Sequence, residues 1–216
     1  EIRPRDWSSD VCSSDLCDES DDPLSRHIET LACETQRLGL QGRVAGSHLT
    51  SMHSMDNYYV SKLLPLMKEA GVAAIANPLI NITLQGRHDT YPKRRGMTRV
   101  KELMAAGLNV AFGHDCVMDP WYPLGRADML DVAHMGLHVA QMTGTEAMRS
   151  CFAAVTTNPA AILGLEGYGL TPGCFADLVI LQATDTIDAI RRRPPRLSVV
   201  RRGRVVARSA ASSAEV

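Results

Sequence analysis

Residues 108–115, LNVAFGHD, form an apolar stretch that follows a predicted helix over 98–106 and a glycine at 107. The same order of helix, glycine and apolar strand occurs twice before it. A strand is predicted at 43–49 (RVAGSHL) after a helix over 22–38, and another at 72–79 (VAAIANPL) after a helix that begins at Asp56 or Asn57. The strands begin at residues 43, 72 and 108, and βα units need roughly 30 residues or more. The repeat therefore predicts consecutive βα units.

Strands that are apolar on both faces are typical of a parallel sheet covered by helices. Two architectures fit this pattern, the (β/α)₈ barrel and the open doubly wound sheet. The sequence contains neither G-x-G-x-x-G nor G-x-x-x-x-G-K-[ST], which disfavours the nucleotide-binding form of the open sheet. A whole barrel takes about 250 residues, so we predict an α/β fold in which residues 17–169 form the C-terminal portion of a (β/α)₈ barrel. Beyond a helix over 126–142, short β-type stretches predict a small β-sandwich segment over 170–216.

Composition narrows the class of protein. The chain has 216 residues, 23 Lys and Arg against 24 Asp and Glu, and a net charge of −1. This balance disfavours a nucleic-acid binder, and no apolar run approaches the ~18 residues of a membrane span. Six irregularly spaced cysteines predict free thiols in a reducing compartment. We therefore predict a soluble cytoplasmic protein without nucleic-acid or membrane partners. Eight arginines near the C-terminus predict a solvated face or a subunit contact: Arg191, Arg192, Arg193, Arg196, Arg201, Arg202, Arg204 and Arg208.

Residues 1–16, EIRPRDWSSDVCSSDL, differ from the rest of the chain because they show neither helical nor strand periodicity. They also lack the basic start and apolar centre of a signal peptide. The run RDWSSDVCSSDL resembles translated sequencing-adaptor sequence, and the alternative is a flexible tail. We predict that residues 1–16 are an extraneous leader and that the natural chain continues upstream of Cys17.

Three polar side chains occupy the ends of predicted strands. His48 and Asp115 end the second and fourth strands, and Glu19 follows a presumed strand end at Cys17-Asp18. In a βα barrel, reactive residues gather at the C-terminal ends of the strands. Two carboxylates and an imidazole at one mouth suit a hydrolytic metal site, where a bound water loses a proton more easily and side chains move protons. The alternative is that these residues only cap strand ends.

Two further signals carry less weight. His134 and His138 are four residues apart on a predicted helix, but HMGLH lacks the glutamate of the H-E-x-x-H zinc motif. We predict that they flank the packed face of that helix. Cys116, beside Asp115, is the thiol best placed to line a pocket.

From Cys17 to about Arg208 the sequence resembles the cytosine deaminase branch of the amidohydrolase superfamily. The resemblance is carried by CDESDD (17–22), GSHLTSMHS (46–54), ANPLINITLQGRHDTYPKRRG (76–96), FGHDCVMDPWYPLG (112–125) and the closing GCFADLVIL and VVRRGRVV stretches. It implies a distorted (β/α)₈ barrel with a small β-sandwich, assembly into homo-oligomers, and a divalent metal, iron or zinc, as cofactor. The implied reaction is the hydrolysis of cytosine to uracil and ammonia, with a small nucleobase as the binding partner.

The resemblance also implies roles for individual residues. Glu19 resembles the acid/base that protonates the ring nitrogen. His48 resembles the histidine that orients the attacking water or ligates the metal, and Asp115 resembles a metal ligand that accepts the water proton and passes it toward ammonia. Trp121 is expected to pack near the pyrimidine. Cys116 takes the neighbouring pocket position, where some relatives carry Asp.

The family's His-x-His metal ligands do not occur in this sequence, and Leu16 stands where a histidine is expected before CDE. At most two of the expected metal-site positions remain, whereas a catalytic zinc usually has three protein ligands. We therefore predict that the chain is part of a truncated enzyme and is inactive alone. The alternatives are an amidohydrolase acting on a related base or cyclic amide, such as isocytosine, isoguanine or creatinine, and a non-catalytic remnant.

Overall fold

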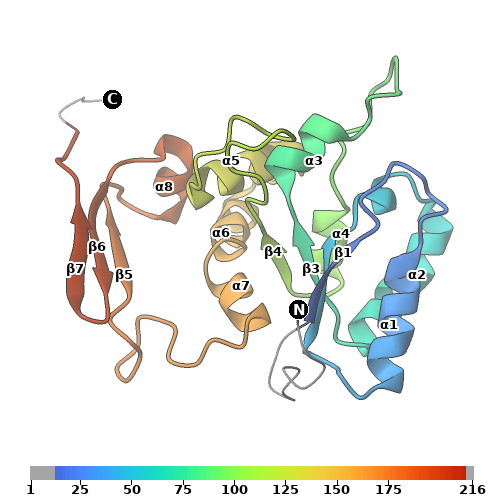
Figure 1. The fold of residues 1–216 in the computed structure, drawn as a ribbon, viewed down its shortest axis with the longest axis horizontal. Helices are drawn as coiled ribbons and strands as arrows, with labels where there is room; N and C mark the ends of the chain where they lie inside the picture. Colours follow the sequence, from blue (N-terminus) through green and yellow to red (C-terminus); the bar gives the residue numbers. More distant parts are fainter. Residues whose placement is uncertain (1–12, 213–216) are drawn as a thin grey trace.

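The computed structural model describes residues 13–212, and its centre is a parallel sheet of four strands (Figure 1). The strands are β1 (Ser13–Cys17), β2 (Val44–His48), β3 (Ala73–Ala76) and β4 (Val110–Phe112), and they lie side by side in chain order. All three neighbouring pairs are parallel. Successive parallel strands joined by helices form the predicted portion of a (β/α)₈ barrel.

Helices pack around the sheet, and others lie between it and the C-terminal strands (Figure 1). Their bounds are α1 (His27–Arg37), α2 (Asn57–Glu69), α3 (Pro78–Leu84), α4 (Val100–Ala105), α5 (Met129–Val139), α6 (Thr145–Ala153), α7 (Thr157–Ile162) and α8 (Thr186–Arg192), with a 3₁₀ helix, η1, at Thr50–His53. The core between helices and sheet is built from fully buried side chains such as Phe112, Ile28, Leu49, Met52 and Met67. Helix α5 packs closely on β4, because a Cβ added at Gly136 would lie 2.5 Å from the Phe112 ring.

The first strand includes residues in which the sequence shows no strand periodicity. Strand β1 begins at Ser13, inside the segment 1–16 that we expected to be an extraneous leader. Its backbone pairs with β2 from Ser13 opposite Val44 to Cys17 opposite His48. Strand pairing uses backbone groups, so it can form without an apolar alternation in the sequence. The prediction for residues 1–12 lies outside the described residues.

Other boundaries shift for local reasons. The predicted helix over 22–38 starts only at His27, and the predicted strand over 72–79 ends at Ala76, where Asn77-Pro78 begins α3 with proline in its first turn. Strand β4 is confined to three residues. Helices α3, α6 and α8 were not predicted. Helix α2, which follows Asp56, was predicted. The Asp56 side chain caps it by accepting the Tyr59 N–H at 2.9 Å.

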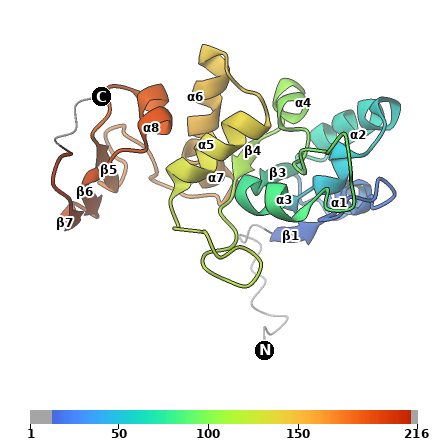
Figure 2. The ribbon, with the colours of Figure 1, turned by 90° about the horizontal axis from the view of Figure 1, so that it is seen from above.

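A second, antiparallel sheet lies at the end of the molecule away from α1 and α2 (Figures 1 and 2). It consists of β5 (Leu178–Leu181), β6 (Arg196–Arg201) and β7 (Arg204–Arg208). Six arginines of the predicted basic block form ion pairs with carboxylates of this chain: Arg191 and Arg192 with Asp188, Arg193 with Asp131, Arg196 with Asp128, and Arg201 and Arg202 with Asp177. Four carboxylates of the chain thus pair with six of the eight arginines. Within residues 13–212, no helix has the length and apolar character to cross a membrane.

Asp128 joins the two parts of the fold. Its carboxylate caps α5 by accepting the Leu130 N–H at 2.8 Å, and it pairs with Arg196 of β6. Burial raises the pKa of Asp128, but the Arg196 and Leu130 hydrogen bonds outweigh it, so the pKa lies below the ordinary 3.8. A lowered folded-state pKa means that the charge stabilises the fold above pH 3.8 and that this stabilisation disappears as pH falls through the folded value.

Replacing Asp128 with Asn keeps a capping oxygen and removes the charge. We expect the free energy of unfolding to fall by about 1 kcal/mol at pH 7 and the difference to disappear in strong acid. Urea unfolding of both proteins across this pH range measures it. Asp56→Asn, at the exposed cap of α2, is the matched control and should change stability by only a few tenths of a kcal/mol, roughly. Equal losses in both variants would contradict the ion-pair explanation.

Candidate active site

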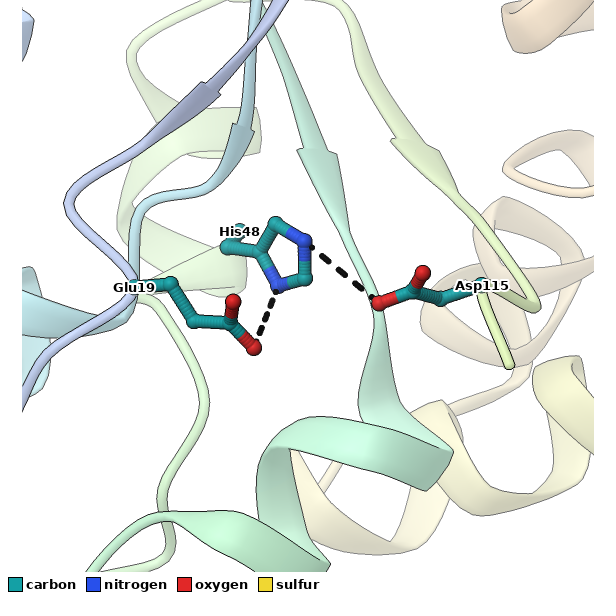
Figure 3. A group of neighbouring side chains, drawn as sticks. All are labelled: Glu19, His48 and Asp115. Atoms are coloured by element: carbon teal, nitrogen blue, oxygen red, sulfur yellow. Dashed lines mark ion pairs between the residues drawn. The ribbon is translucent and has the colours of Figure 1, made fainter. Parts of the chain in front are cut away.

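The structure brings together the three side chains that the sequence places at strand ends (Figure 3). His48 Nδ1 lies 3.2 Å from Glu19 Oε1, and His48 Nε2 lies 3.4 Å from Asp115 Oδ2. His48 is buried between the two carboxylates, with 4% of its side chain exposed. Glu19 follows β1, His48 ends β2 and Asp115 follows β4. The clustering prediction is therefore confirmed as geometry, while the roles of these residues remain predictions.

The backbone turns sharply where these side chains leave the sheet. His48 has φ 73°, Asp115 has φ 63°, and Asp18, just before Glu19, has φ 55°. These values lie in the left-handed region, which Asp, Asn and His enter more readily than most residues. Each strand thus ends in a turn at the same edge of the sheet, the edge where the three side chains meet.

A neighbouring asparagine orients His48. Asn81 Nδ2 donates to His48 Nδ1 at 2.9 Å, and Asn81 Oδ1 accepts the Asn77 N–H at 3.2 Å. Because Asn77 fixes which end of the Asn81 amide faces the ring, His48 Nδ1 is an acceptor. A neutral His48 then carries its proton on Nε2, the nitrogen that faces Asp115. Sequence reasoning missed Asn81, although its position one helical turn after Asn77-Pro78, directly beyond a strand, was a usable signal.

Burial shifts the pKa values of Glu19 and His48 in opposite directions. Burial, reinforced by the nearby Asp115 charge, raises the pKa of Glu19 above its ordinary 4.5. Burial also lowers the pKa of His48 below 6.5, although the Asp115 charge opposes this. At neutral pH His48 is therefore neutral, and the Glu19 carboxyl holds a proton more readily than an exposed glutamate does. This is the arrangement needed for a carboxyl group that delivers a proton.

The two predicted substrate-binding residues lie in different surroundings. Cys116 is buried beside Asp115, and burial together with the Asp119 carboxylate raises the pKa of its thiol to about 12. It is therefore a neutral thiol at physiological pH. Trp121 is 68% exposed, on the loop between β4 and α5, where its backbone N–H donates to Asp119 Oδ1 at 2.9 Å. The structure does not bring the Trp121 ring into the Glu19, His48 and Asp115 cluster.

The cluster fits a divalent metal in the type and spacing of its donor atoms. Glu19, His48 and Asp115 each offer one ligand atom, and these atoms lie within 4.8 Å of one another; this is the only such group among residues 13–212. Because Asn81 leaves the proton on Nε2, the geometry favours Asp115 as a ligand and His48 as a hydrogen-bond donor beside it.

His134 and His138 do not join this group. Their ring centroids lie 4.4 Å apart on α5, and His134 Nδ1 accepts a hydrogen bond from Arg193 at 2.7 Å. His138 Nδ1 is also engaged, by the His134 carbonyl oxygen at 2.7 Å. The pair therefore contributes to the packing of α5 against the segment after α8.

Comparison with known proteins identifies the fold and its relatives. The sequence profile of the amidohydrolase family matches residues 12–207. The structure of 5-methylcytosine deaminase from Klebsiella pneumoniae, liganded with 5-fluorocytosine, is 43% identical and superposes with a TM-score of 0.90 over 94% of this chain and 49% of that chain. The structure of N-isopropylammelide isopropylaminohydrolase from Burkholderia multivorans is 30% identical, with a TM-score of 0.73 over 84% of this chain and 43% of that chain.

A curated relative adds a third activity. The pterin deaminase of Rhizobium rhizogenes is 31% identical over 194 residues, which are 89% of this chain and 44% of that protein. The chain thus spans less than half the length of each of these three relatives. The match across nearly all of its residues shows that the chain belongs to the amidohydrolase family, and within that family it is similar to the cytosine deaminase-like branch.

Proposed function

We propose that the protein acts in the metal-dependent hydrolytic deamination of a cytosine-type base, which converts cytosine to uracil and ammonia. The observation that carries this proposal is the meeting of Glu19, His48 and Asp115 at one edge of the sheet. It is supported by the 43% identity to a structure named as a 5-methylcytosine deaminase. Cytosine and 5-methylcytosine are therefore the first substrates to test.

Each residue has a chemical role in this proposal. Glu19, whose pKa is raised by burial, protonates the ring nitrogen next to the carbon under attack. His48, held by Asn81, donates from Nε2 to orient the attacking water. Asp115 accepts the proton of that water and passes it toward the amino group, which leaves as ammonia. When bound, a divalent metal, iron or zinc, supplies Lewis acidity and lowers the pKa of water; Asp115 would hold it.

We propose that Cys116 and Trp121 define the base pocket. A neutral, buried thiol at Cys116 tolerates an apolar substituent on the pyrimidine better than a carboxylate would, because a buried charge needs a polar partner. Trp121 would have to move from its exposed position to cover the base. An amidohydrolase acting on a related base or cyclic amide is the second candidate, since a pterin deaminase and an N-isopropylammelide hydrolase are among the relatives. Comparing kcat/KM for cytosine, 5-methylcytosine, isocytosine, isoguanine and creatinine separates the two.

Residues outside the described cluster must complete the metal site, because the sequence contains no His-x-His. We therefore propose that the 216-residue chain is inactive alone, and that activity belongs to the whole protein, acting as a cytoplasmic homo-oligomer. The test compares the chain alone with the chain joined to the half of the Klebsiella enzyme that it does not match. Turnover by the joined protein only would support the proposal; turnover by the isolated chain would contradict the need for further ligands, and a remnant would be inactive in both forms.

Removal of metal is expected to abolish deamination by the active, joined protein. A catalytic metal lowers the pKa of water from 15.7 to about 7, so its loss should reduce kcat by several orders of magnitude. Dialysis against a chelator, followed by titration with Zn²⁺ or Fe²⁺ and measurement of ammonia release, tests this and shows which metal restores activity. Full activity in a protein with no bound metal would overturn the hydrolytic metal mechanism.

A further inference from the structure

The segment between α3 and α4, residues 85–96, runs out from the sheet and returns, and we call it the strap (Figure 1, green loop after α3). Its tip is solvated, since Tyr91 is 91% exposed. Its two arms meet near the base, where a Cβ added at Gly86 would lie 3.3 Å from the Arg94 carbonyl oxygen. The strap is therefore closed at its base and open to solvent at its tip.

Both arms of the strap bind the loop that carries Glu19. The Gly86 N–H donates to Asp21 Oδ2 at 2.8 Å, and Arg94 Nη1 donates to the Asp21 carbonyl oxygen at 3.0 Å. Asp21 lies two residues after Glu19 on the same loop. These contacts join residues 65 and 73 positions apart in the sequence, so they restrain the Glu19 loop from outside its own βα unit.

Arg94 is held rigidly for this contact. Its Nε and Nη2 atoms donate to the two oxygens of Asp89 at 2.8 and 2.7 Å, and its Nη1 also donates to Ser54 Oγ at 2.5 Å. A guanidinium bound through both forks has little freedom to rotate. The Arg94 hydrogen bonds lower the pKa of Asp89 well below its usual range, so the partner carboxylate stays charged.

The segment that follows His48 also lies against Asp21. His53 Nε2 lies 2.9 Å from Asp21 Oδ1, and 7% of the His53 side chain is exposed. His53 ends η1, which begins two residues after His48. One residue, Asp21, thus connects the Glu19 loop, the η1 segment and the strap.

We propose that Arg94 is a positioning residue for Glu19, and that the strap sets the distance between the Glu19 carboxyl and the base it protonates. This inference rests on the proposed function, because it assigns the strap to the same site. Without the guanidinium, the Asp21 carbonyl loses its strap partner and the Glu19 loop gains freedom. A displacement of about 1 Å can cost up to about 100-fold in rate, and it should reduce kcat more than it changes KM, because proton delivery follows binding.

The kinetic test is made on the joined protein and uses Arg94→Gln, with Arg94→Lys as a conservative variant and Arg87→Gln as a matched control. Arg87 lies on the exposed part of the strap, where its Nε donates to the Thr83 carbonyl oxygen. We expect Arg94→Gln to lower kcat by about 10- to 100-fold with KM unchanged within about twofold. Arg94→Lys should recover part of the loss through a single donor to Asp21, and Arg87→Gln should match the parent protein.

Hydrogen exchange on the 216-residue chain gives a readout that needs no substrate. Backbone amides of residues 18–22 should exchange faster in Arg94→Gln and at the parent rate in Arg87→Gln. Unchanged exchange and kcat in Arg94→Gln, or a rise in KM at constant kcat, would overturn the inference. If the joined protein with no substitution deaminates none of the bases, the proposed function fails, and the exchange rates alone decide whether the strap holds the Glu19 loop. If Arg94→Gln does not fold, kcat and the exchange rates of residues 18–22 are measured on Arg94→Lys instead.

Discussion

Replacing Glu19 with Gln is expected to lower kcat for deamination by about 10²- to 10⁴-fold, the usual contribution of a positioned acid or base. Glutamine has nearly the same shape but cannot give up a proton at neutral pH. The substitution also removes one of the two negative charges that flank His48, so the fold should tolerate it. Steady-state kinetics of the active form with cytosine and 5-methylcytosine measures the effect.

The matched control is Glu34→Gln on helix α1. Glu34 is exposed and pairs with Arg37 at the helix surface, where an ion pair contributes about 0–1 kcal/mol. The kcat of Glu34→Gln should equal that of the protein without the substitution. A loss below tenfold in Glu19→Gln would show that Glu19 does not transfer a proton in the slow step, and that Asp115 or another group must do so.

The second large effect is expected at Asp18, and it concerns stability. The Asp18 carboxylate accepts the backbone N–H groups of His27 and Ile28 at 3.0 and 2.9 Å and the Ser25 hydroxyl at 2.8 Å. Burial raises the pKa of Asp18, but these hydrogen bonds outweigh it and hold the pKa below 3.8. In Asp18→Asn, an amide N–H would face one of the donors. Since hydrogen bonds to a charged group contribute about 1.5–3 kcal/mol each, we expect a loss of about 3 kcal/mol, measured by urea unfolding.

Asp22→Asn provides the comparison for Asp18→Asn. Asp22 lies at an exposed position in the same loop and accepts only a local bond, from the Leu24 N–H at 2.9 Å. Its replacement should cost less than about 0.5 kcal/mol, as most surface substitutions do. If the two variants lose the same stability, the buried carboxylate is not what holds the start of α1.

The candidate site could be predicted because its signals are local. A polar residue directly after an apolar strand marks the edge of a parallel sheet, and parallel strands share that edge. His48 and Asp115 met this condition, Glu19 followed a presumed strand end, and the structure places His48 within ion-pairing distance of both carboxylates. The helix after Asp56 was predictable for the same reason, since its cap lies three residues from the N–H group it binds.

What the sequence did not reveal depends on residues far apart in the chain. Helix α1 starts at His27 because the N–H groups of its first turn are bound by Asp18, at the end of β1, while Arg26 supplies no side-chain cap. An Asp-Pro pair near residue 22 offered a local start, and the distant carboxylate determined the actual one. The pairing that makes Ser13–Cys17 a strand likewise depends on β2, which lies about 30 residues later. Such contacts have no short-range signature.

The left-handed turns at Asp18, His48 and Asp115 also bear on how this site can change during evolution. A non-glycine residue in this conformation costs roughly 1–2 kcal/mol relative to glycine. At two of these positions glycine would relieve that cost while removing the side chain that faces the cluster. A lineage released from selection for catalysis could therefore gain stability by losing its chemistry, one strand end at a time. Persistence of Asp115 and His48 in such a lineage would indicate that the site is still in use.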